Sequence, residues 1–188
     1  TAVRNYVVND KAQRLQPPYK LLPTQSISEL QLKKKDKLRL FHISLGFPIG
    51  ICNGLDSEFD CVHHDWTKGN NKNIIYTFSQ FNPDVVFLQL QSEEAVNKVG
   101  YETIQKMSER AVTFNWTGDV RHPIPNLYYA LANAVSSTLF SNMTDVEIMK
   151  DGGVENVDYL QVGFDAETFN PIGKEIVENV PQVIFMGS

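Results

Sequence analysis

Short apolar runs alternate with amphipathic segments over residues 37–162. The apolar runs predict buried β-strands, and apolar positions spaced three or four residues apart predict helices. The predicted strands cover residues 38–45, 59–65, 84–89, 111–116, 137–140 and 157–162, and the predicted helices cover residues 73–81, 93–110, 126–134 and 144–151. Strands that alternate with helices form βαβ units. We therefore expect a Rossmann-like three-layer α/β/α fold with a mainly parallel sheet of six to seven strands.

Both ends of the chain depart from this pattern. Residues 1–36 carry several prolines and only weak periodicity, which predicts an N-terminal arm or linker. Residues 37–171 form the predicted Rossmann-like domain. Residues 172–188 predict a connector and then a buried strand at Val183–Met186, and such a parallel strand needs covering neighbours. We therefore expect the chain to stop at the first strand of a second, missing domain.

Composition and charge narrow the classes of function. The net charge is −5, which argues against a nucleic-acid-binding surface because such surfaces are basic. No stretch has the roughly 20 apolar residues that a membrane-spanning helix needs, and the first residues do not form a signal peptide. Cys52 and Cys61 lack the spacing of a metal or disulfide motif. We therefore predict a cytoplasmic protein with reduced cysteines, no transmembrane segment and no nucleic-acid partner.

Polar and aromatic residues recur at the carboxyl ends of the predicted strands, where ligands bind in open parallel sheets. The candidate substrate-binding residues at these ends are Gly46, Phe47, Gln89, Trp116, Arg121 and Asn142. The loop 46–54 has glycines four residues apart, which does not match a phosphate-binding motif. It predicts either flexible backbone beside a ligand or a plain connection that needs positive φ angles.

The densest group of chemically active side chains lies at residues 117–122, after the fourth predicted strand. It combines the carboxylate of Asp119, the guanidinium of Arg121 and the imidazole of His122. A carboxylate or imidazole at this position could remove a proton from an incoming hydroxyl. The alternative is that Asp119 caps a turn and pairs with Arg121, with His122 exposed before a proline. Asp119 is the first candidate for a catalytic base and His122 the second.

The run His63-His64-Asp65 is a candidate for metal binding. In a strand, His63 and Asp65 share one face while His64 points to the other. That arrangement supplies at most two ligands, and the sequence shows no third. We therefore predict no metal site.

Several segments together resemble the N-terminal half of a GT-B glycosyltransferase. They are the first strand with its glycine-rich loop, the Pro-Asp-Val-Val strand at residues 83–86, and the strand that ends near Asp119. The sequence LQVGFDAETFNP at residues 160–171 is similar to the Pro-Asn-Gly-Val-Asp…Phe-x-Pro signature that ends that domain. Gln161 and Val162 replace the Pro-Asn pair of the signature. The resemblance covers residues 37–188, and within the class it is GT4-like or CgeB-like.

The resemblance implies a division of labour between two domains. Residues 37–171 would be the acceptor-side domain, and their partners would be a carbohydrate or glycosylated acceptor and the missing C-terminal domain. That second domain would bind the nucleotide-sugar donor, so we expect no cofactor in this fragment and no activity from it alone. In this family a base on the N-terminal side often activates the acceptor hydroxyl, a role that would fall to Asp119 or His122. Gly163 and Asp165 would shape the crossing between the domains.

Two other readings of the chain stay open. The first is a non-catalytic Rossmann-like module for binding or interaction. The second is a flavodoxin-like or nucleotide-binding domain, although the lack of a phosphate-binding motif counts against it.

Overall fold

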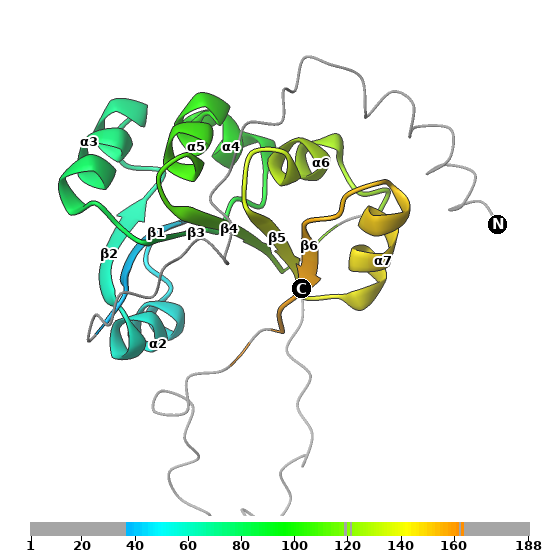
Figure 1. Cartoon of the computed structure of the whole chain (residues 1–188), viewed down its shortest axis with the longest axis horizontal. Coiled ribbons are helices and arrows are strands. Elements are labelled where there is room, and N and C mark those ends of the chain that lie inside the picture. The colour runs from blue at the N-terminus through cyan, green and yellow to red at the C-terminus, as the bar shows by residue number, and fades with distance from the viewer. Residues whose placement is uncertain (1–36, 119, 121, 162, 164–188) are drawn as a thin grey trace, which may run out of the picture.

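The computed structural model describes residues 37–118, 120, 122–161 and 163. These residues form a six-stranded, all-parallel sheet with six helices, in the strand order β2-β1-β3-β4-β5-β6 (Figure 1). The strands are β1 (Arg39–Ser44), β2 (Asp60–Asp65), β3 (Val85–Leu88), β4 (Val112–Thr117), β5 (Ser137–Phe140) and β6 (Val157–Tyr159). The predicted Rossmann-like three-layer α/β/α class is confirmed.

The helices lie on both faces of the sheet. They are α2 (Ile49–Glu58), α3 (Asn71–Phe81), α4 (Glu93–Val99), α5 (Tyr101–Ser108), α6 (Asn126–Ala132) and α7 (Met143–Asp151). Figure 1 shows α3 to α6 along one face and α2 on the other. The strand order explains this division, because parallel crossovers are right-handed. The connection through α2 runs to one side of β1, whereas the later connections run to the other side.

The main core lies between the sheet and the helices α3 to α7. Phe41 and Ile43 of β1 and Leu88 of β3 are fully buried and pack in one cluster with Phe78 of α3. Val146 of α7 belongs to the same cluster. Alternate residues of these strands point to the α2 face, as the two-residue repeat of a strand requires. The register places His42 between His63 and Phe87 on that face.

Two of the predicted elements are wrong in a way that has a physical cause. Residues 93–110 were expected to form one helix, but the helix is interrupted at Gly100, where φ is +83°. A side chain there would be strained, and its Cβ would lie 2.7 Å from Nδ2 of Asn71. The expected loop 46–54 is loop only at its start, because α2 begins at Ile49 and includes both Gly50 and Gly54. Its packing on the sheet, through the buried Cys52, outweighs the low helix propensity of glycine.

Other element ends differ by a few residues from the prediction. The sixth strand stops at Tyr159, three residues before its predicted end. Ser92 caps α4, since its Oγ accepts a hydrogen bond from the backbone N–H of Ala95. The predicted arm 1–36, the connector and strand within 172–188, and the family signature beyond Gly163 lie outside the described residues. Within the described part of the chain, no helix is long and apolar enough to cross a bilayer.

The side-chain amide of Asn156 joins the end of α6 to the start of β5. Its Nδ2 donates hydrogen bonds to the carbonyl oxygens of Ala132 at 2.6 Å and Val135 at 3.0 Å. The backbone carbonyl oxygen of Asn156 accepts a hydrogen bond from the backbone N–H of Thr138 at 2.9 Å. Asn156 therefore holds the entry to β5 and β6 in place.

Asn156→Asp is expected to lower the free energy of unfolding by about 1–3 kcal/mol at neutral pH, because a carboxylate would face two carbonyl oxygens without a donor. Urea denaturation measures the change. Asn97→Asp on the exposed face of α4 is the matched control and should stay within about 0.5 kcal/mol of the parent. Equal losses in both variants would show that the hydrogen bonds of Asn156 contribute nothing specific.

Candidate functional site

The carboxyl edge of the sheet contains a topological switch point between β1 and β3. From β1 the chain moves outward to β2 and then returns past β1 to β3. The loops after these two strands therefore diverge, which opens the place where α/β sheets bind ligands. Gly46 follows β1 with φ +62°, and its carbonyl oxygen accepts a hydrogen bond from Oγ of Ser44 at 2.8 Å. The positive φ angle expected for this loop is present at Gly46.

Exposed apolar side chains gather at the same edge. Among the described residues, seven large apolar side chains are exposed, and six of them lie at or just after the carboxyl end of a strand. These six are Leu45, Phe47, Ile49, Met143, Tyr159 and Leu160. The seventh is Tyr76 on α3. A concentration of exposed apolar side chains on one edge marks a binding surface.

His122 and Asp145 form a pair at this edge. His122 follows β4, and its side chain is 47% exposed. Asp145 lies in the first turn of α7, and its side chain is only 5% exposed. Nε2 of His122 lies 3.0 Å from Oδ1 of Asp145. This contact has the distance of an ion pair but not the geometry of a hydrogen bond. A carboxylate beside Nε2 favours the hydrogen on that nitrogen, which leaves Nδ1 as the ring nitrogen able to accept a proton.

The start of α7 is fixed by Asn142, whose Oδ1 accepts a hydrogen bond from the backbone N–H of Thr144 at 2.9 Å. This side chain was a candidate for substrate binding, and the structure places it as the N-cap of α7 at the carboxyl edge. The cap sets the direction of the first turn and so positions Asp145 beneath His122.

The loop after β4 is tied to the loops after β5 and β6. Nε1 of Trp116 donates to the carbonyl oxygen of Leu160 at 3.2 Å, and Oγ of Ser141 donates to the carbonyl oxygen of Gly118 at 2.6 Å. A Cβ on Gly118 would lie 2.6 Å from the Trp116 ring, so the ring can cover this position only because residue 118 is glycine. The candidate Trp116 therefore shapes the loop that leads to His122.

The loops after β1 and β2 also meet. Asp65 ends β2, is buried, and accepts hydrogen bonds from Oγ1 of Thr67 at 2.8 Å and from its backbone N–H at 3.0 Å. Burial opposes ionisation of this carboxyl, but these bonds, a backbone hydrogen bond from Gly46 and the charge of Lys68 hold its pKa below the usual range. Nζ of Lys68 lies 5.6 Å from the centre of the Phe47 ring. Phe47 is thus presented beside a cation.

A cavity of about 310 Å³ lies on the face of the sheet that α3 to α6 cover. Its walls come from α4, α5 and α6 and include Glu93, Asn97, Tyr101 and Asn126. Glu93 and Asn126 begin their helices, so this cavity opens toward the same edge of the sheet, where helices of βαβ units start. It adds amide, carboxylate and aromatic groups to that edge.

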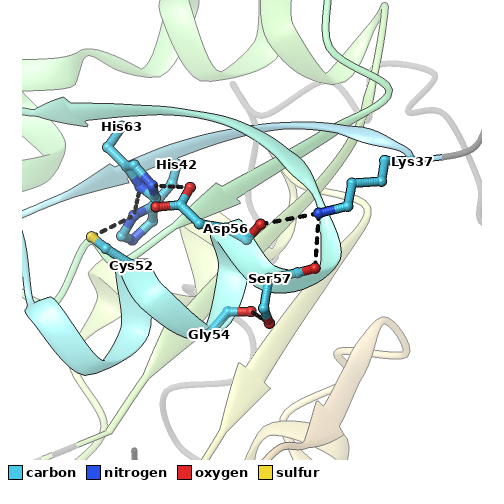
Figure 2. A network of polar contacts seen from close by, with 7 residues as sticks. All are labelled: Lys37, His42, Cys52, Gly54, Asp56, Ser57 and His63. Carbon is cyan, nitrogen blue, oxygen red and sulfur yellow. Dashed lines mark hydrogen bonds and ion pairs between the residues drawn. The ribbon is translucent and has the colours of Figure 1, made fainter. Parts of the chain in front are cut away.

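A second group of polar side chains lies on the α2 face, below the carboxyl edge. His42 and His63 stand side by side on β1 and β2, and Cys52 and Asp56 approach them from α2 (Figure 2). Nδ1 of His42 lies 2.9 Å from Nδ1 of His63 and 4.0 Å from Sγ of Cys52. Burial lowers the pKa of His42 to about 4, so this imidazole is neutral at physiological pH. Burial raises the pKa of Cys52.

The structure places the other candidates as follows. Gln89 is buried on the α2 face, where its Oε1 lies 2.8 Å from Nε2 of His42. Gly163 has open space where a Cβ would be. Asp119, Arg121 and Asp165 lie outside the described residues, so the pairing predicted for Asp119 stays a prediction.

Sequence reasoning missed two features of this arrangement. Asp145 has the position of an acidic residue in the first turn of a helix, which is usually read as a favourable interaction with the helix dipole. His42 and Cys52 were not connected with His63, because the three residues belong to different elements. The run His63-His64-Asp65 was expected to supply at most two ligands, and the structure brings His42, Cys52 and Asp56 to His63 from other positions in the chain.

Comparison with known proteins gives no relative. No protein-family model matches the chain, and no curated protein matches it either. The geometry of the described residues is therefore what supports a function.

Proposed function

We propose that this chain is the acceptor-side domain of a glycosyltransferase, which moves a sugar from a nucleotide-sugar donor to an acceptor hydroxyl. The observation that carries the proposal is the pair of His122 and Asp145 at the carboxyl edge of the sheet. A half-exposed imidazole whose second nitrogen is held by a buried carboxylate has the arrangement of a general base.

The chemistry assigned to this pair is a proton transfer. The acceptor hydroxyl lies against Nδ1 of His122 and gives up its proton as its oxygen attacks the anomeric carbon of the donor sugar. The bond from that carbon to the nucleotide phosphate breaks, and the nucleotide leaves with the electron pair. The carboxylate of Asp145 keeps the imidazole in the required tautomer and stabilises the imidazolium that forms. A second domain of the enzyme holds the nucleotide sugar.

The apolar side chains of the edge supply the binding surface for the acceptor. Phe47 is exposed beside Lys68 and offers a flat face to a sugar ring, and Trp116 borders the loop that carries His122. The acidic net charge supports a carbohydrate acceptor over a nucleic acid. Free cysteines at positions 52 and 61 support a cytoplasmic enzyme.

A second candidate function is a non-catalytic binding module. The exposed apolar side chains at the carboxyl edge favour it, because such a surface also suits a protein partner. Under this alternative, His122 and Asp145 would serve only to hold the loop after β4 against α7.

Carbohydrate binding by the 188-residue chain tests the proposal. The labelled chain is applied to an array of oligosaccharides, and the best ligand is then titrated by calorimetry. We expect one class of oligosaccharide to bind, and Phe47→Ala to weaken the binding at least tenfold, which corresponds to about 1.4 kcal/mol. UDP-glucose, as a donor probe, should bind weakly.

Tyr76→Ala is the matched control, because Tyr76 is an exposed aromatic residue on α3, away from the carboxyl edge. This variant should bind the oligosaccharide like the parent chain. If no oligosaccharide binds, or if both variants lose binding equally, the acceptor role is wrong and the interaction module is favoured.

A further inference from the structure

The hydrogen bonds of His42 and His63 beneath α2 indicate which imidazole nitrogens carry a hydrogen. Nε2 of His42 lies 2.8 Å from Oε1 of Gln89, and Nε2 of His63 lies 3.0 Å from Oδ1 of Asp56. Both partners are oxygen atoms that accept hydrogen bonds, so each Nε2 carries a hydrogen. In a neutral imidazole the other nitrogen then has a lone pair.

The two lone pairs face each other. Nδ1 of His42 and Nδ1 of His63 are 2.9 Å apart, with no hydrogen between them when both rings are neutral (Figure 2). Sγ of Cys52 points to the same place from α2, 4.0 Å from Nδ1 of His42. A proton shared by the two rings or a metal ion between them would remove the repulsion of the two lone pairs, and a metal ion would bind the thiol sulfur as well.

We propose that His42, Cys52 and His63 bind a divalent transition-metal ion of the zinc type through Nδ1, Sγ and Nδ1. We call these residues the three-donor cluster. Their ligand atoms all lie within 4.8 Å of one another. The proposal does not depend on the glycosyltransferase function.

The distances suit such an ion after a small adjustment. At zinc bond lengths of about 2.0–2.3 Å, tetrahedral ligand atoms lie roughly 3.3–3.6 Å apart. The observed separations of 2.9 and 4.0 Å lie on either side of this range. A change of about 0.4 Å in each direction brings these two pairs of atoms into that range, and the ligand atoms of Cys52 and His63 lie within 4.8 Å of each other. Two imidazoles and one thiolate are a donor set that zinc accepts.

The Nε2 atoms of both histidines in the three-donor cluster have oxygen partners that would orient the two rings toward a metal ion. Histidines that bind metal nearly always donate their other N–H to a carboxylate or carbonyl oxygen. Asp56 has this role for His63, and Gln89 has it for His42. His42 and Cys52 are buried, whereas the Asp56 side chain is 54% exposed, so the ion enters from the side of Asp56. A water molecule completes the coordination.

Metal binding releases one proton from the protein. The Cys52 thiol releases its proton to solvent when the metal–sulfur bond forms, and both imidazoles keep the hydrogens on Nε2. The ion would join α2 to β1 and β2, because the cluster draws one donor from each of these elements. It would thereby fix the start of α2 and the Gly46 loop that precedes it.

A neighbouring set of donors makes the proposal testable. Asp56, Cys61 and His63 form a second group of close ligand atoms, which shares His63 with the three-donor cluster. Oδ1 of Asp56 lies 3.0 Å from Nε2 of His63, and burial together with the nearby carboxylate of Asp56 raises the pKa of the Cys61 thiol to about 12. We therefore assign Asp56 to the second shell and leave Cys61 outside the site.

Titration of the reduced 188-residue chain with Co²⁺ reports the ligands directly. We expect one equivalent to bind, with the near-ultraviolet charge-transfer band of a thiolate ligand and the intense visible bands of tetrahedral cobalt. Cys52→Ser should lose the charge-transfer band and at least tenfold in affinity. Cys61→Ser is the matched control and should keep both. Zn²⁺ at about 100 times its Kd should raise Tm by about 5–10 °C, whereas Mg²⁺ should not.

Asp56→Asn gives an independent readout if Cys52→Ser does not fold, because Asp56 is exposed. This variant should keep the charge-transfer band and lose about 10–100-fold in affinity. If the folded parent chain shows no thiolate band and no shift of Tm with Zn²⁺, the proposal is wrong and the two imidazoles share a proton. Loss of the band in Cys61→Ser, whether or not Cys52→Ser also loses it, contradicts the assigned donors.

Discussion

Replacing His122 by alanine is expected to lower sugar transfer about 10²–10⁴-fold in the glycosyltransferase that we propose, because the acceptor hydroxyl would lose its general base. The loss should appear in kcat, with little change in the binding of the acceptor. Initial rates with saturating donor measure it. Circular dichroism checks that the variant is folded, and its Tm is expected to fall, because the buried Asp145 loses an ion-pair partner.

Asp145 acts through His122 and is therefore a positioning residue. Asp145→Asn should lower kcat less than His122→Ala. The loss should appear in kcat and not in KM for the acceptor, because the buried Asp145 lies against His122 and acts through it. Glu147→Gln, at an exposed position of the same helix, is the control and should leave kcat unchanged. Full activity in His122→Ala would remove this residue from the mechanism and return Asp119 to first place.

Replacing Leu88 by aspartate is expected to unfold the domain. Leu88 is fully buried in β3, in register with Ile43 of β1 and Asn115 of β4. The substitution removes apolar burial worth about 2–5 kcal/mol and leaves a carboxylate in the core without a partner, which costs several kcal/mol more. The sum approaches the whole stability of a typical domain, about 5–15 kcal/mol. Circular dichroism and proteolysis measure the outcome.

The same substitution at an exposed leucine provides the comparison. Leu45 follows β1 and is 65% exposed, so Leu45→Asp should change the free energy of unfolding by less than about 0.5 kcal/mol. A cooperative thermal transition in Leu88→Asp, close to that of Leu45→Asp, would mean that β3 does not lie at the centre of the sheet.

The fold was predictable because its signal is local. Apolar runs such as Val85–Leu88 are buried on both faces, and their alternation with helices leaves few arrangements other than a parallel sheet. The errors fell where a tertiary contact outweighs local preference. Gly100 divides a helix against Asn71 of α3, and the glycines of α2 are helical because the helix packs on the sheet.

The candidate site was predictable in part. The rule that ligands gather at the carboxyl ends of strands placed Gly46, Phe47, Trp116 and Asn142 at the correct edge, and His122 with them. It could not indicate which carboxylate lies against His122. Asp145 is far enough along the chain that only the packing of α7 beside β5 brings it within 3.0 Å.

The sequence by itself determined the parallel α/β architecture and the edge at which polar and aromatic groups collect, because burial and alternation are recorded in every segment. Only the tertiary structure decided which groups meet. The pair of His122 and Asp145 joins the loop after β4 to α7, and the three-donor cluster joins β1, β2 and α2. The physical reason is that a hydrogen bond or a metal bond needs its atoms within about 3 Å. Such distances between separate elements are fixed by the packing of the whole sheet and its helices.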